Sequence, residues 1–505
     1  LFRRFSERET QKVLFNYTGV EFVSKSERRR FRHILFLLAL FLATNLGVFA
    51  VSSYLYNNPR ETWWSLRSQL TDLGFWGHFY AKILPQKKSI ADRSEDDFLT
   101  KIKVDWQKMQ NLTVVDQTKK LALPILTKPN ILLVQLESVQ NWAIENSVTP
   151  MPFLKKLLAE NLTVPDFHSS SCETINAEFG ALCGFWPRSD RPISGFLQNE
   201  FTCLPDILRN EEEYATYFFH ANVAEFWNRD KLISAFGFEK TFFSPYFDSR
   251  LDDKRFYEQI LSELKKETKP FFAHAVTILS HSPHSDEVIE FQNRVHQSNV
   301  RPFVEKIDDK ITENIKTDKK TLRNYFGFLR AVDDGLKYLF TEIDKDDFFA
   351  NTVVILYADH RFYNFVSENK LQNFQMYNRL PVAIVLPDKQ QGRLAQIGSQ
   401  MDLAPTILQL IEGADYRERE NFFGQSFFSP KHQNLAVNKC LGQVYLQSEN
   451  FTIVGNASTN QYETIFSSEI ERKNELMLES LKNLITDSDA VLDNDEFKET
   501  EQSSN

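Results

Sequence analysis

A threonine within a run of small polar residues is the first candidate for chemistry in this chain. Thr174 follows Ser169-Ser-Ser-Cys-Glu173 and precedes Ile175-Asn-Ala-Glu-Phe179, a pattern typical of a loop that opens a helix. An alcohol is almost entirely protonated at neutral pH, so it becomes a nucleophile only when a neighbouring group removes its proton. A bound metal ion would have this effect. The alternative role for Thr174 is that of an ordinary helix N-cap.

Side chains that bind metals follow three apolar segments elsewhere in the chain. They are Glu137 after 131–136, His281 after 271–279, and Asp359 with His360 after 352–357. Ligands bind beyond the carboxyl ends of parallel strands, so these side chains are expected at one edge of a sheet. With Thr174 they offer carboxylate, imidazole and alcohol donors, which suit Mn²⁺, Mg²⁺ or Zn²⁺. One Asp-His pair alone is typical of a turn, but several such groups after different strands predict a metal site.

The elements that must position these groups alternate between strands and helices. Further strands are expected at 214–219 and 382–386, and helices at 150–158, 325–343 and 404–411. Buried apolar strands alternating with helices indicate an α/β fold with a largely parallel sheet flanked by helices. Short alternating runs beyond residue 434 predict a small antiparallel annex.

We expect six segments along the chain. They are a basic segment at 1–33, a transmembrane helix at 34–56, a membrane-proximal helical connector at 57–128, a catalytic domain at 129–433, an antiparallel and helical annex at 434–485, and an acidic tail at 486–505. The tail is polar and lacks an apolar period, which favours disorder. Because the chain begins with Leu1 rather than Met, we expect it to be a fragment.

The run 34–56 contains no charged residue and is long enough to cross a bilayer, at about 33 Å as a helix. Arg28, Arg29 and Arg30 precede it, so the positive-inside rule assigns 1–33 to the cytoplasm and the rest of the chain to the outside. A buried core helix and a cleaved signal peptide are the alternatives. The run is too long for a signal peptide and lacks a clear cleavage site.

Charge and cysteine usage restrict the partners and the compartment. The net charge is −9, and the basic residues form no stripe beyond the N-terminal segment, which argues against nucleic-acid binding. Four cysteines allow three pairings. We favour Cys183 with Cys203, which would close a loop of about 20 residues and contribute roughly 3 kcal/mol in the chain-entropy model. Buried free thiols are the alternative; a disulfide would imply an oxidising compartment.

Six ordered motifs resemble the lipoteichoic acid synthase family, a membrane-anchored branch of the sulfatase/alkaline phosphatase superfamily. The motifs are Leu136-Glu-Ser138, Thr174-Ile-Asn-Ala-Glu-Phe179, Phe226-Trp-Asn-Arg-Asp230, Thr277-Ile-Leu-Ser-His281, Ala358-Asp-His360 and Asp402-Leu-Ala-Pro-Thr406. The resemblance implies a sulfatase-like catalytic domain at 129–433 and one divalent metal ion, with Mn²⁺ ahead of Mg²⁺ and Zn²⁺. It implies Thr174 as the nucleophile and a fourth ligand beside Glu137, Asp359 and His360.

The resemblance also implies a phosphoglycerol pocket. Its lining residues would be His220, Asn222, Trp227, Arg229 and His281. Arg229 could grip a phosphate bidentately, Trp227 could form an apolar wall, and His281 could donate a proton. A surface arginine and a core tryptophan are the alternatives. Asn222 stands where the family often carries an acidic residue, and the cysteines are more similar to the phosphoglycerol transferases of Gram-negative envelopes.

The function that the resemblance implies is phosphoglycerol transfer at a bacterial cell membrane, with the catalytic domain outside the cytoplasm. Thr174 would attack the phosphate of phosphatidylglycerol, release diacylglycerol and pass glycerol phosphate to a polymer or glycan hydroxyl. If water accepted the group, the protein would be a phosphodiesterase or phosphatase. A non-catalytic envelope protein that binds lipid or polymer is a third alternative. Sulfatases need Cys or Ser before x-Pro-x-Arg, whereas Ile175 and Asn176 follow Thr174.

Overall fold

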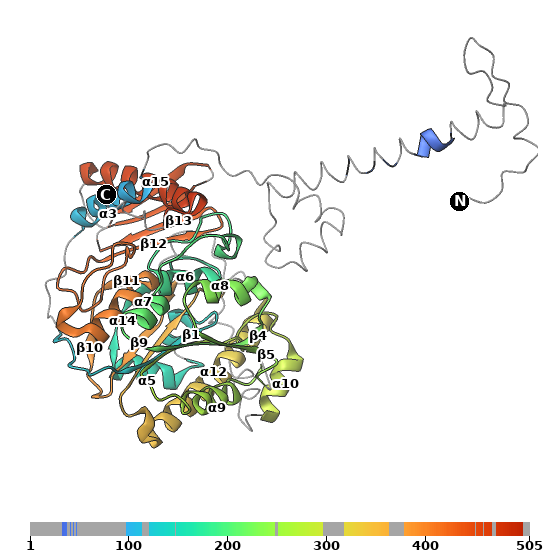
Figure 1. The fold of residues 1–505 in the computed structure, drawn as a ribbon, viewed down its shortest axis with the longest axis vertical. Helices are drawn as coiled ribbons and strands as arrows, with labels where there is room; N and C mark the ends of the chain where they lie inside the picture. Colours follow the sequence, from blue (N-terminus) through green and yellow to red (C-terminus); the bar gives the residue numbers. More distant parts are fainter. Residues whose placement is uncertain are drawn as a thin grey trace, which may run out of the picture. The chain divides into compact units, whose positions relative to one another are not determined.

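The computed structural model describes two units of the chain, Leu1–Lys88 and Ser89–Asn505 (Figure 1). The described residues are 33–37, 41, 44, 47, 97–113, 121–146, 148–247, 251–295, 318–362, 378–449, 451–457, 459–466 and 471–497. In the first unit these residues are helical, and the apolar side chains of 34–37 are exposed. None of the helices within these described ranges has the length and hydropathy needed to span a bilayer. Most of the predicted transmembrane segment, and the connector up to residue 96, lie outside the described residues.

An eight-stranded sheet forms the centre of the second unit. Its strand order is β10-β2-β9-β7-β1-β6-β4-β5. The bounds are β1 Asn130–Leu136, β2 Leu162–Thr163, β4 Ala215–Val223, β5 Lys240–Ser244, β6 Phe271–Val276, β7 Thr352–Ala358, β9 Val382–Val385 and β10 Gly392–Arg393. Strands β7, β1, β6, β4 and β5 are mutually parallel, and only β9 runs antiparallel to its neighbours β7 and β2. The structure therefore confirms the predicted α/β fold with a largely parallel sheet.

Helices cover both faces of this sheet, which explains why its central strands β1, β6 and β7 are buried along almost their whole length. In Figure 1, α6 (Thr174–Cys183), α7 (Leu204–Asn210) and α8 (Arg229–Ala235) lie on one side, and α5 (Pro152–Glu160), α9 (Asp253–Leu264) and α12 (Lys319–Lys345) lie on the other. Helix α14 (Leu403–Glu412) packs against α6. The short helix α4 (Asn141–Glu145) contacts α5, and α10 (Asp286–Val295) contacts α12.

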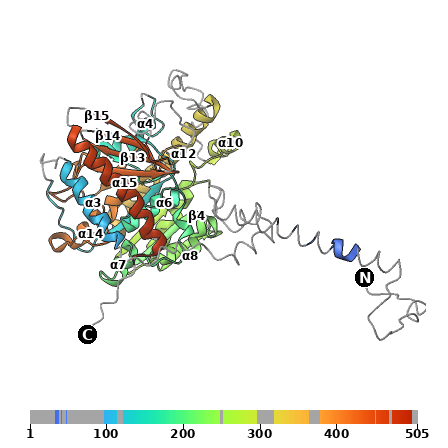
Figure 2. The ribbon, with the colours of Figure 1, turned by 90° about the horizontal axis from the view of Figure 1, so that it is seen from above.

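Two smaller sheets lie beside the central one. Strands β11 (Ile397–Ser399), β3 (Asp166–His168) and β8 (Arg379–Leu380) form the first, and β12 (Leu435–Cys440), β13 (Gln443–Ser448), β14 (Phe451–Asn456) and β15 (Gln461–Phe466) form an antiparallel second. Helix α15 (Glu471–Asn494) follows β15 and packs against α3 (Phe98–Leu112), as Figure 2 shows. We refer to β12–β15 and α15 together as the C-terminal module.

The predicted disorder from residue 486 is wrong for the part of the tail that the structure describes. Helix α15 continues to Asn494. Leu484, Val491 and Leu492 are buried along it, so an apolar stripe with helical spacing exists within the acidic sequence. The many acidic residues on the remaining face made this stripe hard to recognise in the sequence. A second difference concerns the strand predicted at 271–279, because β6 ends at Val276 and the buried Ile278 and Leu279 belong to the following loop.

Candidate active site

Four polar side chains meet beyond the carboxyl ends of β1 and β7. The Thr174 hydroxyl donates to Glu137 Oε2 at 3.1 Å and lies 3.3 Å from His360 Nε2. His360 Nε2 is 3.5 Å from Glu137 Oε1 and 3.4 Å from Asp359 Oδ2. The donor atoms of Glu137, Asp359 and His360 all lie within 4.8 Å of one another, and all three residues are buried. This arrangement is a candidate metal site with an alcohol beside it.

The pairing of β1 with β7 brings these residues together. Leu136 is opposite Ala358 in the parallel register, so the next residues, Glu137 and Asp359, leave the sheet side by side. Ser138 then adopts a positive φ of 52°, which turns the chain sharply at this edge. Its backbone N–H donates to Asp359 Oδ1 at 2.8 Å. The first ligand pair is therefore fixed by sheet register and one strained turn.

One oxygen of Asp359 indicates where a cation would bind. Asp359 Oδ1 accepts hydrogen bonds from the backbone N–H groups of Ser138 and His360, at 2.8 and 2.6 Å. Asp359 Oδ2 is buried and accepts no hydrogen bond from any described residue. A buried carboxylate oxygen without a donor is costly unless a cation or proton compensates it. The donor set of this cluster therefore fits a divalent metal ion.

The ionisation of the cluster agrees with this interpretation. Burial raises the pKa of Asp359 well above its usual range, and the charge of Glu137 raises it further. Burial lowers the pKa of His360, although Glu137 opposes the change. Burial would also raise the pKa of Glu137, but its electrostatic interactions with His281 and His360 and the hydrogen bonds from Ser138 and Thr174 together leave this pKa below its usual range. Two close carboxyl groups with opposite shifts would both ionise beside a dication.

The tautomer of His360 leaves Nε2 for the cluster. Its Nδ1–H donates to the backbone carbonyl of Arg361 at 2.9 Å. A carbonyl can only accept, so Nε2 carries the lone pair that faces Glu137 and Thr174. Metal-binding histidines are commonly oriented by such a bond.

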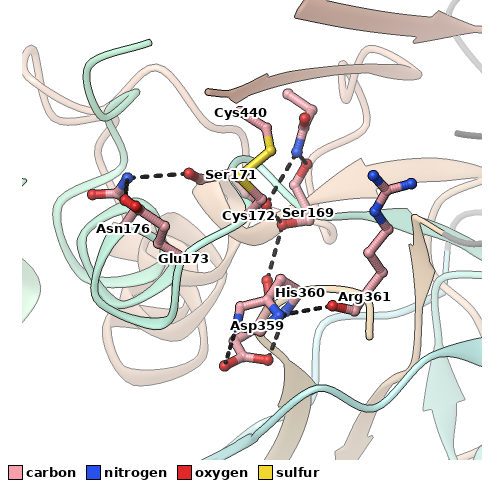
Figure 3. Close-up of a disulfide and its surroundings, with 10 residues drawn as sticks. Ser169, Ser171, Cys172, Glu173, Asn176, Asp359, His360, Arg361 and Cys440 are labelled. Atoms are coloured by element: carbon pink, nitrogen blue, oxygen red, sulfur yellow. Dashed lines mark hydrogen bonds and ion pairs between the residues drawn. A yellow bond between two sulfur atoms is a disulfide. The ribbon is translucent and has the colours of Figure 1, made fainter. Parts of the chain in front are cut away.

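A glutamine joins the loop before Thr174 to the strand end that bears Asp359. Gln400 Oε1 accepts from the backbone N–H and the hydroxyl of Ser170, at 2.9 and 2.8 Å. Gln400 Nε2 donates to the backbone carbonyls of Ala358 and Asp359. The Ser169 hydroxyl also donates to Asp359 O at 2.9 Å, as Figure 3 shows. Sequence reasoning missed Gln400, although it lies two residues before the Asp402-Leu-Ala-Pro-Thr406 motif.

Arg229 lies in the interior and is bound to α6, the helix that begins at Thr174. Its side chain is 1% exposed, and Nη2 is 2.5 Å from Oε1 of Glu178, which is fully buried. Its Nε is 3.2 and 3.3 Å from the two Glu178 oxygens, whereas Nη1 is buried with no hydrogen-bond partner among the described residues. Glu178 is one helical turn after Thr174, so the arginine and the alcohol share one support. Arg229 is thus no surface arginine, and the role of Glu178 was missed.

The remaining predicted pocket residues lie near the carboxyl ends of the parallel strands β4 and β6 or in the segments after them. His220 is buried near the end of β4 and donates from Nδ1 to Val276 O at 2.9 Å. Trp227 is 9% exposed and has a positive φ of 61° in the 3₁₀ turn Phe226–Asn228 before α8. His281 lies in the loop after β6 and is close enough for its charge to lower the pKa of Glu137. Asn222 Oδ1 accepts a hydrogen bond from the backbone N–H of the next residue, Val223, at 3.0 Å.

The structure contains two disulfides. Cys183 is bonded to Cys203, the pairing that the sequence favoured. Cys172 is bonded to Cys440, 268 residues away (Figure 3). The second pairing was not expected, because no local feature of the sequence connects two positions so far apart. It links the residue two before Thr174 to the end of β12.

Comparisons of sequence identify relatives of this chain. Residues 129–414 match the family model named Sulfatase. Lipoteichoic acid synthase 1 of Bacillus subtilis (strain 168) is 28% identical over 338 residues, which cover 60% of this chain and 49% of that protein. Lipoteichoic acid synthase of Staphylococcus aureus (strain NCTC 8325 / PS 47) is 27% identical over 381 residues, which cover 69% and 54%. The chain therefore spans about half the length of the curated relatives it matches.

Two solved structures illustrate the fold of this chain. The lipoteichoic acid synthase LtaP from Listeria monocytogenes has a TM-score of 0.59 at 19% identity, covering 77% of this chain and 98% of that chain. A protein in the alkaline phosphatase superfamily from Vibrio parahaemolyticus has a TM-score of 0.56 at 17% identity, covering 78% and 97%. These likenesses confirm the sulfatase/alkaline-phosphatase-like fold.

Proposed function

The chain belongs to the sulfatase family, and from this premise we propose that it is a membrane-anchored phosphoglycerol transferase. It would move glycerol phosphate from phosphatidylglycerol to a hydroxyl of a polymer or glycan. The observation that carries the proposal is the Thr174 hydroxyl, which lies 3.1 Å from Glu137 and 3.3 Å from His360 at the carboxyl edge of the sheet. The lipoteichoic acid synthases among its relatives support phosphotransfer rather than sulfate ester cleavage.

In this proposal Glu137, Thr174, Asp359 and His360 hold one divalent cation, with Mn²⁺ preferred. The cation supplies a lowered pKa for the alcohol and compensates charge on the phosphodiester oxygens. The Thr174 oxygen forms a bond to phosphorus, and its proton passes to a neighbouring base. The bond from phosphorus to the diacylglycerol oxygen breaks, and His281 gives that oxygen a proton. An acceptor hydroxyl then displaces Thr174 from the glycerophospho-threonine intermediate; the proton of the acceptor passes to His281, and the threonine regains its own proton from the base that received it.

The pocket residues in this proposal bind and orient the donor. Arg229 is held by Glu178, which leaves its buried Nη1 as a donor for a phosphoryl oxygen. His220 and Trp227 would contact the glycerol phosphate, and Asn222 would contribute a neutral group where related sites are acidic. Pre-orientation by Glu178 reduces the entropy lost when the phosphate binds.

The proposed location is the bacterial cell membrane, with segment 34–56 as the anchor and the catalytic domain outside the cytoplasm. Exposed apolar side chains at 34–37 support contact with lipid. The two disulfides support an oxidising compartment. A tethered catalytic domain would meet a lipid donor at high effective concentration.

The test uses the full chain with vesicles of labelled phosphatidylglycerol and Mn²⁺. We expect release of diacylglycerol and a glycerol phosphate adduct on the peptide that contains Thr174, detected by mass spectrometry. Thr174→Ala should lose the adduct and at least about 10³-fold in turnover, because no oxygen remains to attack. Thr174→Ser, which keeps the hydroxyl, is the matched control and should retain part of the activity. Diacylglycerol release by Thr174→Ala at the wild-type rate would exclude this nucleophile.

The products also separate the proposal from its alternatives. Glycerol phosphate attached to an added glycan or polymer supports the transferase. Free glycerol phosphate as the sole product, whatever acceptor is added, would instead identify a phosphodiesterase. Vesicle binding without diacylglycerol release would indicate a non-catalytic lipid-binding protein.

A further inference from the structure

The first strand of the C-terminal module lies against the loop that precedes Thr174. The backbone N–H of Lys439 donates to Ser170 O at 3.0 Å. The Asn438 side-chain amide donates to Ser169 O at 2.8 Å and to Ser171 O at 3.1 Å. Three consecutive carbonyls of the loop therefore accept hydrogen bonds from β12. These residues are buried, so water does not replace the bonds easily.

A covalent bond continues this contact toward the nucleophile. Cys440, the residue after Lys439, is bonded to Cys172. Figure 3 shows this disulfide beside Ser171 and above Asp359 and His360. Cys172 is two residues before Thr174, which begins α6. The loop is thus fixed on one side by β12 and on the other by Gln400, which joins Ser170 to Asp359.

The strand itself is anchored in the C-terminal module. The Lys439 side chain is fully buried and donates from Nζ to Ser488 Oγ at 2.8 Å and to Asp489 Oδ1 at 2.6 Å. Asp489 also accepts from the backbone N–H and the hydroxyl of Ser189, at 3.2 and 2.6 Å. A buried charge paired in this way resists displacement, because separating the pair leaves a charge uncompensated. Helix α15 therefore helps to hold β12 in place, and β12 in turn holds the loop before Thr174.

We propose that Asn438 and the Cys172–Cys440 disulfide are positioning groups for Thr174 and its cation site. They hold the alcohol at the distance from Glu137 and His360 that attack requires, and they do not touch the donor. This inference rests on the proposed function for its rate effects. A displacement of about 1 Å at a reacting group can cost about 10²-fold in rate. His220 lies on β4, and Glu178, which holds Arg229, lies one helical turn beyond Thr174, so donor binding should change less than attack.

The first variant removes the disulfide as Cys172→Ser with Cys440→Ser. We expect kcat to fall by about 10- to 100-fold, while KM for phosphatidylglycerol stays within about 2-fold. The matched control is Cys183→Ser with Cys203→Ser, which removes the other disulfide and should keep kcat. In the wild type a thiol reductant should reproduce the loss, whereas the Cys172/Cys440 variant should not respond further. Equal kcat losses in the two disulfide variants would overturn the proposal.

A second variant keeps both disulfides, so it remains informative if the first does not fold. Asn438→Leu removes the side-chain donors at similar volume, and the same fall in kcat at unchanged KM is expected. Hydrogen exchange of the amides at 169–176 is measured by mass spectrometry in all variants. Exchange should accelerate there in the Cys172/Cys440 and Asn438 variants, and stay at the wild-type rate in the Cys183/Cys203 control.

The exchange measurement also separates failure of this inference from failure of the proposed function. It requires no substrate, so it is decisive even if the wild type does not turn over phosphatidylglycerol. Unchanged exchange at 169–176 in both test variants would overturn the positioning role, whatever the activity. Accelerated exchange together with an unchanged kcat would overturn it as well, because the loop would then move without affecting attack.

Discussion

Replacing Arg229 with methionine tests whether α6 holds the arginine through Glu178. Both side chains are out of contact with water, at 1% and 0% exposed, and Nη2 is 2.5 Å from Oε1. Removing one member of a buried ion pair typically costs about 3–5 kcal/mol, because the other charge remains uncompensated. Replacing both members with apolar residues of similar volume is often close to neutral. We therefore expect Arg229→Met to lose about 3–5 kcal/mol in the free energy of unfolding, and Arg229→Met with Glu178→Met to recover most of it.

The sign of the pH dependence follows from the carboxyl group. Burial raises the pKa of Glu178 above its usual range, and Arg229 opposes that rise. Without Arg229 the pKa in the folded state rises further, so the folded protein binds this proton more tightly than the unfolded chain does. Its stability is then highest below the unfolded pKa of 4.5 and falls as the pH rises through the folded pKa. The deficit of Arg229→Met should therefore be larger at pH 8 than at pH 5.

The assay is urea unfolding of wild type, both single variants and the double variant at pH 5 and pH 8. A double-mutant cycle from these data gives the coupling energy of the pair. If the double variant were as unstable as Arg229→Met, or if the deficit were equal at both pH values, the ion pair would not be the cause. Arg229 would then have to be held in place by contacts other than the one with Glu178.

Two further predictions concern stability away from the reacting groups. Burial raises the pKa of Asp253 to about 8, so wild-type stability should fall as the pH rises from 3.8 toward 8. Asp253→Asn should flatten this slope and gain a few kcal/mol at pH 8 in thermal unfolding. Asp252→Asn removes only the smaller cause of the raised pKa, the neighbouring charge, and should flatten the slope less; equal slopes in the two variants would refute the assignment. Cys183→Ser with Cys203→Ser should lose roughly 3 kcal/mol in urea unfolding without loss of kcat, since the disulfide closes a 20-residue separation and Cys183 lies at the opposite end of α6 from Thr174.

The sequence predicted that Glu137, Asp359 and His360 lie together because these residues come just after apolar strands. Glu137 and Asp359 leave adjacent parallel strands at the same register, so strand ends alone locate them on one edge. The approach of Thr174 to that edge came from the family motif, since nothing local in the sequence connects residue 174 to the others. An apolar run in the sequence indicates that a segment is buried, but it does not show where strand pairing ends. The strand predicted at 271–279 was too long for this reason.

The contacts that sequence reasoning missed join positions far apart in the chain. Asn438 contacts Ser169 and Ser171, and Cys440 is bonded to Cys172, with no periodicity or spacing to indicate either pairing. Such contacts depend on the tertiary arrangement of the C-terminal module, which a local pattern does not encode. The same holds for Glu178, whose side chain is satisfied only by an arginine on a different helix.

The order in which these parts are synthesised has a consequence for when activity can begin. Proteins are made from the amino end, so a growing chain contains Glu137, Thr174, Asp359 and His360 before β12 exists. Until residues 438–440 have been translated and β12 has formed, the loop before Thr174 lacks the hydrogen bonds from Asn438 and the disulfide to Cys440. A nascent or prematurely terminated polypeptide would thus contain every reacting group, but the loop before Thr174 would not be held in position. Maturation of the carboxyl-terminal region would act as the last step of activation.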